Sequence, residues 1–238
     1  MRIACFSDVH SNLLALEAVL QDIKGQSVDS VYCLGDVVGY APFPNEVIEL
    51  LRKENIPTVM GNYDQGTGFE LEDCGCAYRQ AEEKQLGDLS FHWTKERVTR
   101  ENKAFLRTFQ NEIRFEIDGK RFLLVHGSPR RINEYLFEER PISSFQHIAK
   151  DAGADVIVCG HTHKPYTKKA GEVLFVNDGS AGKPKDGNPR ACYALIDVSG
   201  GLINVTFRRV PYDVAAVASA IRASELPDQF ADALEQAA

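Results

Sequence analysis

Residues 1–10 read MRIACFSDVH, and this opening stretch guides the interpretation of the rest of the chain. Its first half, residues 2–6, is a short apolar run that ends at a Ser-Asp turn, which is typical of a buried β-strand. Asp8 and His10 follow directly, and both side chains can bind a metal ion. A strand that delivers these groups at its carboxyl end predicts an α/β fold with a site at that end.

The N-terminal part of the chain alternates strand and helix patterns. Asn12 can cap a helix whose apolar residues recur at helical spacing up to Ile23. This order is the βαβαβ arrangement of a parallel sheet covered by helices. We expect strands at 2–6, 29–34 and 56–60, and helices at 13–23 and 44–52.

The pattern then changes twice. Residues 65–112 are polar and rich in helix formers, which predicts a helical insertion or cap within one domain of residues 1–238. Residues 113–127 predict a hairpin that turns at Asp118-Gly119, and short strands recur later, which indicates a second sheet. The other expected elements are helices at 142–151 and 212–238, the latter broken at Pro227, and strands at 154–160, 173–177, 191–198 and 202–210.

The composition is that of an ordinary globular protein with an acidic surface. The 238 residues are 44% hydrophobic and 26% charged, with a formal net charge of -7. An acidic surface repels nucleic-acid phosphates, so we expect no nucleic-acid partner. No apolar run is long enough to span a membrane and the start does not resemble a signal peptide. We therefore expect a cytoplasmic monomer or homodimer.

Six cysteines occur in the sequence. Four of them, at positions 5, 33, 159 and 192, lie in strand-like runs and are expected to be buried thiols. The pair Cys74-Gly75-Cys76 is different, because it is compatible with a redox pair or a metal site. No second pair is present to complete a zinc tetrad, so the role of Cys74 and Cys76 stays open.

Candidate ligands follow five of the expected strands, each just past the carboxyl end. Taken singly these motifs carry little information, because a lone Gly-Asp is usually a turn and a lone histidine is usually structural. Their conjunction at the same edge of a sheet is what predicts a site. His92 and His147 fall in helix-like segments and are not included. The set is Asp8, His10, Asp36, Asn62, Asp64, His126, His161 and His163.

The chemistry of this set indicates metal ions. Neutral imidazole and carboxylate are ligands of manganese, iron, zinc and nickel, and no thiolate is involved. Without Asp64 the set still has seven groups, too many for one tetrahedral ion. Seven groups suit two divalent ions that share a bridging carboxylate, an arrangement that can clamp a phosphate and activate water for attack.

The ordered motifs resemble those of the calcineurin-like metallophosphoesterase superfamily. The resemblance covers nearly the whole chain, and longer stretches such as GDVVGYAPFPNEVIELL and HGSPRRINEYL are similar to a compact single-domain branch found in bacteria and archaea. It implies a four-layer αββα sandwich of two mixed β-sheets flanked by helices. The motifs are DVH at 8–10, GD at 35–36, GNYD at 61–64, HG at 126–127 and GHTH at 160–163.

The resemblance also implies how the ligands divide between the two ions. Asp36 would bridge the ions, and a hydroxide between them would attack phosphorus while Asn62 stabilises the charge on the phosphoryl oxygens. The first ion would be bound by Asp8, His10, Asp36 and His163, and the second by Asp36, Asn62, His126 and His161.

One residue departs from the family pattern. The family's third motif usually reads Gly-Asn-His, with a histidine that protonates or stabilises the leaving group and is oriented by the following acid. Here Tyr63 stands in its place, followed by Asp64. A phenol is a much weaker acid than an imidazolium at neutral pH. We therefore expect leaving groups that need little protonation, such as phosphoanhydrides or aryl phosphates, with Asn62, Tyr63 and Asp64 as catalytic residues.

Substrate contacts are predicted less directly. Asn62, Tyr40 and Arg130 are expected to contact the substrate, Tyr40 by stacking on a base or aryl group. Other basic residues lie in loops after the ligand motifs and are further candidates for contacts with phosphate, although such residues are most often solvated surface charges. These are Arg131, Lys164, Lys183, Lys185 and Arg190.

The function expected from the sequence is a metal-dependent phosphoesterase. It would hydrolyse a phosphodiester, phosphomonoester or phosphoanhydride, with a small nucleotide-type substrate favoured. One alternative is a binding or scaffold protein on the same fold, and another is a nuclease. Intact ligands argue against a scaffold, and the acidic charge argues against a nuclease.

Overall fold

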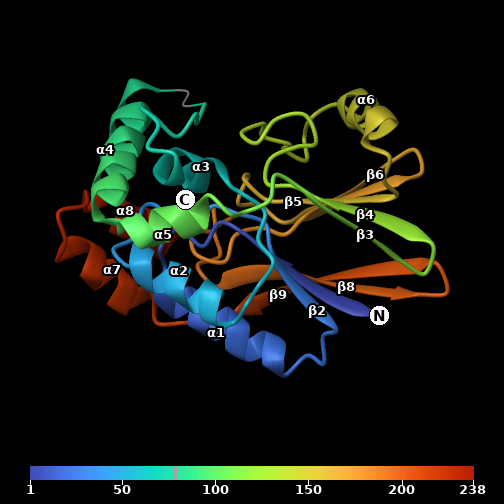
Figure 1. Ribbon diagram of the computed structural model, residues 1–238, viewed down its shortest axis with the longest axis horizontal. Coiled ribbons are helices and arrows are strands. Elements are labelled where there is room, and N and C mark those ends of the chain that lie inside the picture. The colour runs from blue at the N-terminus through green and yellow to red at the C-terminus, as the bar shows by residue number, and fades with distance from the viewer. Residues whose placement is uncertain (78–79) are drawn as a thin grey trace.

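The computed structural model describes residues 1–77 and 80–238, and two β-sheets stacked face to face form its centre (Figure 1). The four-stranded sheet has the order β2-β1-β8-β9. Its strands are β1 (Arg2–Phe6), β2 (Ser30–Cys33), β8 (Ala191–Ser199) and β9 (Leu202–Val210). The five-stranded sheet has the order β3-β4-β5-β7-β6. Its strands are β3 (Ile113–Ile117), β4 (Lys120–Leu124), β5 (Val156–Cys159), β6 (Tyr166–Ala170) and β7 (Val173–Asn177).

Alternation along the strands explains how one strand supplies two cores. In β1, Ile3 and Cys5 pack in the core between the sheets, whereas Ala4 and Phe6 belong to the core under the helices. Successive side chains of a strand point to opposite faces, so a run that is apolar throughout is buried on both sides. The apolar stretch at residues 2–6 therefore indicates an inner strand, as observed.

Helices cover the outer faces of both sheets (Figure 1). On the four-stranded sheet lie α1 (Leu13–Lys24) and α2 (Pro44–Lys53), and on the five-stranded sheet lies α6 (Ile142–Ala152). The Asn12 side chain accepts a hydrogen bond from the Ala15 amide, which confirms the expected cap of α1. The expected four-layer sandwich of two mixed sheets flanked by helices is confirmed.

The remaining helices gather at one end of the sandwich, on the left in Figure 1. Residues 65–112 were expected to form a helical insertion. This segment contains most of the first of these five helices, and all of the second and the third. The C-terminal tail supplies two more, separated at Pro227. These helices are α3 (Asn62–Gly68), α4 (Ala81–Arg97), α5 (Arg100–Leu106), α7 (Val214–Arg222) and α8 (Gln229–Gln236).

Three details of the sequence interpretation were wrong or incomplete. Residues 56–60 form no strand, because only Thr58 and Val59 make bridges, and Pro57 has no N–H to extend them. The βαβ pattern alone indicated a parallel sheet, but β8 pairs antiparallel with β1, which agrees with the mixed sheets that the resemblance implied. Strand β6 was not predicted as a separate strand, because its sequence YTKKA is polar, which suits the sheet edge that it occupies.

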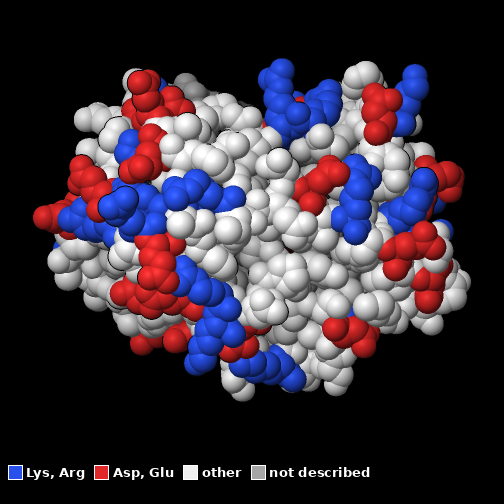
Figure 2. All heavy atoms as spheres, viewed as in Figure 1, with Lys and Arg blue, Asp and Glu red and all other residues white. Residues whose placement is uncertain are grey.

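Charged residues of both signs are mixed on the surface. Figure 2 shows lysine and arginine side chains next to aspartate and glutamate side chains across the face in view. Pairs such as Arg52–Glu101 and Lys103–Glu70 account for part of this pattern. The face in view therefore offers no broad positive surface for a nucleic-acid backbone.

A search of the described residues for membrane spans gave a negative result: none of their helices is both long and apolar enough to cross a bilayer.

We predict that the stack of aromatic rings between the sheets is a main source of stability. Phe122 stacks on Phe115 at 5.1 Å, and Phe115 stacks on Tyr32 of the other sheet at the same distance. Phe122→Ala should lower the free energy of unfolding by about 3–5 kcal/mol, because it leaves a cavity in this core. Urea denaturation would measure the loss. Leu202→Ala, at a residue that is 78% exposed, is the control and should change stability little.

Candidate metal centre

Loops from both sheets carry the ligand candidates to one place between the sheets. In the four-stranded sheet, Asp8 and His10 follow β1 and Asp36 follows β2, while Asn62 is the first residue of α3. The five-stranded sheet contributes the histidines that follow β4 and β5, which are His126, His161 and His163. All seven side chains are buried.

Three of these residues form a first cluster. His163 Nε2 lies 3.3 Å from Asp8 Oδ1 and 3.2 Å from His10 Nε2. His10 Nε2 lies 3.8 Å from the same Asp8 oxygen. Two imidazole nitrogens and a carboxylate oxygen thus face a common point, as the ligands of a divalent cation do.

A second cluster lies beside the first. His126 Nε2 is 3.5 Å from Asp36 Oδ2, 3.1 Å from His161 Nδ1 and 3.2 Å from Asn62 Oδ1. All four groups can be ligands of one ion. The amide oxygen of Asn62 therefore completes a set that combines one carboxylate, one amide and two imidazoles.

Asp36 connects the two clusters. Its Oδ2 atom lies 3.9 Å from His10 Nε2 of the first cluster and 3.5 Å from His126 Nε2 of the second. Its Oδ1 atom accepts a hydrogen bond from the Tyr63 amide at 2.8 Å, which fixes the carboxylate plane. The structure thus brings Asp36 next to both clusters, and the division of the ligands between two ions stays a prediction.

Backbone carbonyls hold three of the imidazoles in the orientation that a metal ion needs. The Nδ1 atoms of His10, His126 and His163 lie 3.1, 2.8 and 2.5 Å from the carbonyl oxygens of Val38, Leu34 and Lys183. Because a carbonyl only accepts, each Nδ1 carries a proton, and each Nε2 is the ring atom that faces the centre and can bind a metal ion.

Burial and charge set the protonation of the histidines. Burial lowers the pKa of His10 to about 3, and it lowers the pKa values of His161 and His163 well below the usual range. Burial acts in the same direction on His126, but the charges of Asp36 and Asp8 outweigh it and raise that pKa to about 10. Three imidazoles are thus neutral, and the field that favours a proton on His126 equally favours a cation.

A buried atom without a hydrogen bond supports this interpretation. Within residues 1–77 and 80–238, Asp8 Oδ1, which faces the first cluster, is buried and has no hydrogen-bond partner. A buried carboxylate oxygen without a partner is costly, and a bound cation would remove that cost for Asp8. The donor set of carboxylate, amide and imidazole groups fits two divalent ions of the manganese, iron, zinc or nickel type.

A short chain of hydrogen bonds fixes the other oxygen of Asp8. Asp8 Oδ2 accepts from the His161 amide at 2.9 Å and lies 2.5 Å from the Ser7 hydroxyl. The Ser7 hydroxyl also lies 2.6 Å from Asp178 Oδ1, and burial raises the pKa of Asp178 well above its usual value. A neutral Asp178 can therefore donate to Ser7, which donates to Asp8. Sequence reasoning assigned Asp178 no role.

The ligand loops have unusual backbone conformations. Five of the seven ligand candidates have positive φ angles between 49° and 66°, a region that non-glycine residues rarely adopt. Such residues persist where the surrounding structure holds them, and they cluster at functional sites. They are Asp8, His10, Asp36, His161 and His163.

Glycines beside the ligands allow close packing more than tight turning. Of Gly35, Gly61, Gly127 and Gly160, only Gly35 has a positive φ. A Cβ atom on Gly61 would lie 2.0 Å from the Asp36 amide nitrogen, and one on Gly160 would lie 2.1 Å from Ser7 Oγ. Any side chain at these positions would displace a ligand loop.

Tyr63 and Asp64 occupy positions that differ from a simple proton donor and its orienting acid. The Tyr63 side chain is buried, its ring lies edge-on to His10, and its hydroxyl donates to the Gly87 carbonyl of α4 at 3.4 Å. Asp64 accepts from the amides of Val37 at 2.9 Å and Gly61 at 3.0 Å. Asp64 thus ties the start of α3 to the Asp36 loop. The catalytic roles expected for both stay predictions.

The two other predicted substrate contacts have different outcomes. Tyr40 lies at the centre, with its ring edge-on to His10 at 4.8 Å. Arg130 instead pairs with Glu134 in its own loop, with Nε 3.1 Å from Oε2, and it is not among the residues that line the adjoining cavity. We find no geometric support for a substrate contact by Arg130.

A cavity of about 830 Å³ adjoins the ligand clusters. Sequence reasoning missed one of its main walls, Tyr135, whose ring stacks on the His161 ring at 3.9 Å. The only signal for Tyr135 was its place within the stretch HGSPRRINEYL, which follows a ligand. Tyr40, Lys183 and Lys185 also line the cavity, so it is the natural entrance for a substrate.

The Cys74-Gly75-Cys76 segment also reaches the centre. Asn62 Nδ2 donates to the Cys74 carbonyl at 3.0 Å and to Cys76 Sγ at 3.1 Å. These bonds turn the Asn62 amide so that its oxygen faces His126. The segment thus positions a ligand candidate, whatever chemistry its thiols carry.

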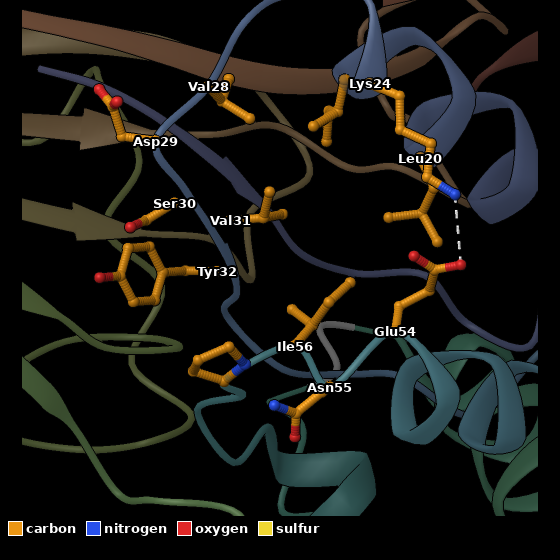
Figure 3. A pocket seen from close by; sticks show the side chains of 12 residues that line it. Leu20, Lys24, Val28, Asp29, Ser30, Val31, Tyr32, Glu54, Asn55 and Ile56 are labelled. Atoms are coloured by element: carbon orange, nitrogen blue, oxygen red, sulfur yellow. Dashed lines mark hydrogen bonds and ion pairs between the residues drawn. The ribbon is translucent and has the colours of Figure 1, made fainter.

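A separate cleft of about 330 Å³ lies at the amino end of β2 (Figure 3). Apolar side chains such as Val31 and Ile56 line it, and Lys24 and Glu54 point toward one another across one side as an ion pair of 3.3 Å. The ligand clusters lie past the opposite end of β2. We therefore do not assign this cleft to the site.

Comparison with known families gives an independent result. The calcineurin-like phosphoesterase superfamily domain matches residues 1–201 of the chain. The uncharacterised protein MJ0912 of Methanocaldococcus jannaschii is 34% identical over 98% of this chain and 96% of its own length. The phosphodiesterase YfcE of Escherichia coli is 25% identical over 83% of this chain and 88% of its own.

Solved structures include similar chains. A metallophosphoesterase from Sphaerobacter thermophilus has a TM-score of 0.81 and 31% identity, covering 100% of this chain and 99% of that one. The hypothetical protein PH1004 from Pyrococcus horikoshii has a TM-score of 0.86 and 23% identity, covering 100% and 98%. The second likeness is one of fold alone.

We predict that removing one imidazole removes one ion. His161→Ala, purified and reloaded with manganese, should bind about one equivalent less than the wild type, because His161 belongs only to the second cluster. Elemental analysis after gel filtration gives the stoichiometry. His92→Ala is the matched control, since His92 is exposed on α4, and it should bind as much metal as the wild type. Equal metal content in both variants would refute the assignment of His161.

Proposed function

The chain belongs to the calcineurin-like phosphoesterase superfamily, whose members are hydrolases of phosphoester bonds that depend on a dinuclear metal centre, and on that premise we propose a specific activity. We propose that this enzyme hydrolyses a small nucleotide-type phosphodiester, phosphomonoester or phosphoanhydride with two divalent ions at the clusters described above. The observation that carries the proposal is the Asp36 carboxylate, which lies between two imidazole clusters.

Two divalent ions held there would act as Lewis acids toward water and the phosphoryl oxygens. The protein's own groups prepare the centre for that chemistry. The carbonyls of Leu34, Val38 and Lys183 hold the imidazole tautomers, and the Tyr63 amide holds Asp36. Because these groups are fixed before the substrate arrives, little reorganisation is needed during the reaction.

The surroundings of the centre favour a small substrate. The adjoining cavity has about 830 Å³, within the range of sites for small molecules. Aromatic side chains form much of its wall, which suits a base or aryl group. The formal net charge of -7 disfavours a long nucleic acid, so the nuclease alternative is the weaker one.

Several finer points belong to the proposal. Manganese is our first choice of metal, although iron, zinc and nickel accept the same ligands. A cytoplasmic monomer or homodimer is the expected state of the protein. A scaffold protein on this fold would be expected to bind its partner protein in the absence of metal. The buried ligand clusters, in which backbone carbonyls fix the histidine tautomers, favour an enzyme instead.

We predict that activity depends on the shared carboxylate. Asp36→Ala should lower the rate of bis-p-nitrophenyl phosphate hydrolysis by more than about 100-fold, since it removes a ligand from both clusters. Asp151→Ala, at an exposed residue near the end of α6, is the matched control and should keep wild-type activity. The assay uses protein stripped of metal and reloaded with manganese. Full activity of Asp36→Ala would contradict the site assignment.

We also predict a preference for good leaving groups. Aryl phosphates and phosphoanhydrides should be hydrolysed at least about 10-fold faster than alkyl monophosphates, because a phenol at position 63 is a poor proton donor. Steady-state rates with p-nitrophenyl phosphate and glycerol phosphate measure the ratio. Tyr63→Phe separates the roles of ring and hydroxyl: a large loss of activity would assign the hydroxyl a part in catalysis. Equal rates on both substrates would refute the preference.

A further inference from the structure

Two lysines beside the metal centre form no ion pair with the residues that the structure describes. Lys183 is 9% exposed, and in the described part of the chain its ammonium group forms no hydrogen bond or ion pair. Its recorded contact is the Tyr40 ring, whose centroid lies 4.7 Å from Nζ. The half-buried Lys185 likewise forms no ion pair with any described residue, and both side chains line the cavity. Buried positive charge of this kind is costly unless an anion compensates it.

The backbone joins these lysines to the centre. The Lys183 carbonyl accepts from His163 Nδ1 at 2.5 Å, and the Lys185 amide donates to the His163 carbonyl at 3.3 Å. The Lys183 amide donates to Ser180 Oγ at 2.8 Å, and Ser180 Oγ donates to the Asp8 carbonyl. The backbone of the segment 180–185 is therefore held in place relative to the metal ligands, so both lysine side chains start from fixed points beside the centre.

Charge balance indicates what the lysines would bind. Two divalent cations would carry four positive charges, and the carboxylates of Asp8 and Asp36 carry two negative charges. The remaining two positive charges could be neutralised by one phosphoryl group. The ammonium groups of Lys183 and Lys185 come in addition. The same cavity wall also contains Glu83, Arg140 and the C-terminal residue Ala238, and Arg140 pairs with Glu134, 3.0 Å away. Lys183 and Lys185 line the cavity next to the centre, so a phosphoryl group there could accept charge-assisted hydrogen bonds from both.

Aromatic rings line the same cavity. Tyr135 stacks on His161 and is followed by Phe137, whose ring lies parallel to it at 5.4 Å. Tyr40 and Phe230 from α8 form another wall and meet edge-on at 5.2 Å. Rings of this kind bind planar groups through their faces and edges. Aromatic and cationic groups together fit a nucleoside that carries more than one phosphoryl group.

We propose that Lys183 and Lys185 form a subsite for a second phosphoryl group, so that the substrate is a nucleoside diphosphate or longer phosphoanhydride. This inference rests on the proposed phosphoesterase function. In the reaction a water oxygen forms a bond to the phosphorus at the metal centre, and the bond from that phosphorus to the bridging oxygen breaks. The electron pair leaves with the departing phosphate, which the two ammonium groups stabilise, and the water proton goes to solvent.

The proposal also accounts for Tyr63. A departing phosphate is already a stable anion at neutral pH, so it needs no general acid in the place of the family's usual histidine. Ammonium groups next to the leaving oxygen stabilise the charge that develops there. The loss of the histidine and the presence of the lysine pair are thus two consequences of one substrate class.

Inhibition tests the subsite without requiring turnover of the nucleotide. Manganese-loaded enzyme hydrolyses bis-p-nitrophenyl phosphate while AMP, ADP or pyrophosphate is added as a competitor. ADP should bind at least about 10-fold more tightly than AMP, because charge-assisted hydrogen bonds to a second phosphoryl group are strong. Lys183→Met and Lys185→Met should each reduce this ADP-to-AMP ratio to below about 3. Lys169→Met, on the exposed edge strand β6, removes the same charge and should keep the wild-type ratio.

A second variant tests the ring subsite. Tyr135→Leu should weaken ADP binding by a larger factor than it weakens pyrophosphate binding, since only ADP carries a base. Metal content and thermal midpoint of every variant verify that it is folded and loaded. If a variant fails these checks, the wild-type comparison of AMP, ADP and pyrophosphate still decides the question.

The outcomes separate the two proposals. If the loaded enzyme hydrolyses no phosphoester, including bis-p-nitrophenyl phosphate, the proposed function fails. If that activity is present but AMP and ADP bind equally to the wild type, only the second-phosphoryl subsite is refuted. Equal losses of AMP and ADP affinity in the lysine variants would also refute it, since the lysines would then act on the first phosphoryl group alone.

Discussion

The position of the Asp36 carboxylate is the constraint on which the rest of the centre depends. One of its oxygens lies between His10 and His126, and the other is fixed by the Tyr63 amide. That amide belongs to α3, whose start is tied to the Asp36 loop by Asp64. The loop and the helix approach so closely that only glycine fits at position 61. Two metal sites can share one ligand because the backbone around that ligand is determined from several sides.

The stacked sheets bring the two halves of the centre together. Residues after β1 and β2 come from one sheet, and residues after β4 and β5 come from the other. Neither sheet alone has a complete ligand set for either cluster. The apolar core between the sheets therefore has a direct effect on the chemistry, since it sets the separation of Asp8 from His163 and of Asp36 from His126. A shift of one sheet against the other would separate the ligands of both ions at once.

Sequence patterns indicated the ligand candidates because each follows an apolar run of strand length, which is a local signal. A neighbouring glycine is a second local signal at four of them, Asp36, Asn62, His126 and His161. The four-layer fold followed from the resemblance together with the change from βαβ units to short strands. Tyr135 could not be placed in this way, because its position depends on loops that meet only in the folded chain. Lys183 and Lys185 were named only among several loop residues that could contact phosphate, for the same reason. Residues 56–60 had an apolar strand pattern, but the segment makes only two isolated bridges, to Cys33 and to Gln110. Pro57 has no N–H that could extend them. The local sequence pattern does not predict which other segment of the chain a given segment will pair with.

The acidic exterior and the cationic interior act in opposite directions on possible substrates. A formal net charge of -7 repels a long polyanion, which must pass over much of the surface to bind. A small phosphate ester meets the exterior only briefly and then enters a cavity with two lysines and two candidate cation sites. Low-dielectric walls strengthen the attraction inside the cavity, whereas salt screens the repulsion outside. Under the proposed function, size and charge would be selected together, because the lysines and candidate cation sites lie at a cavity of small-molecule size.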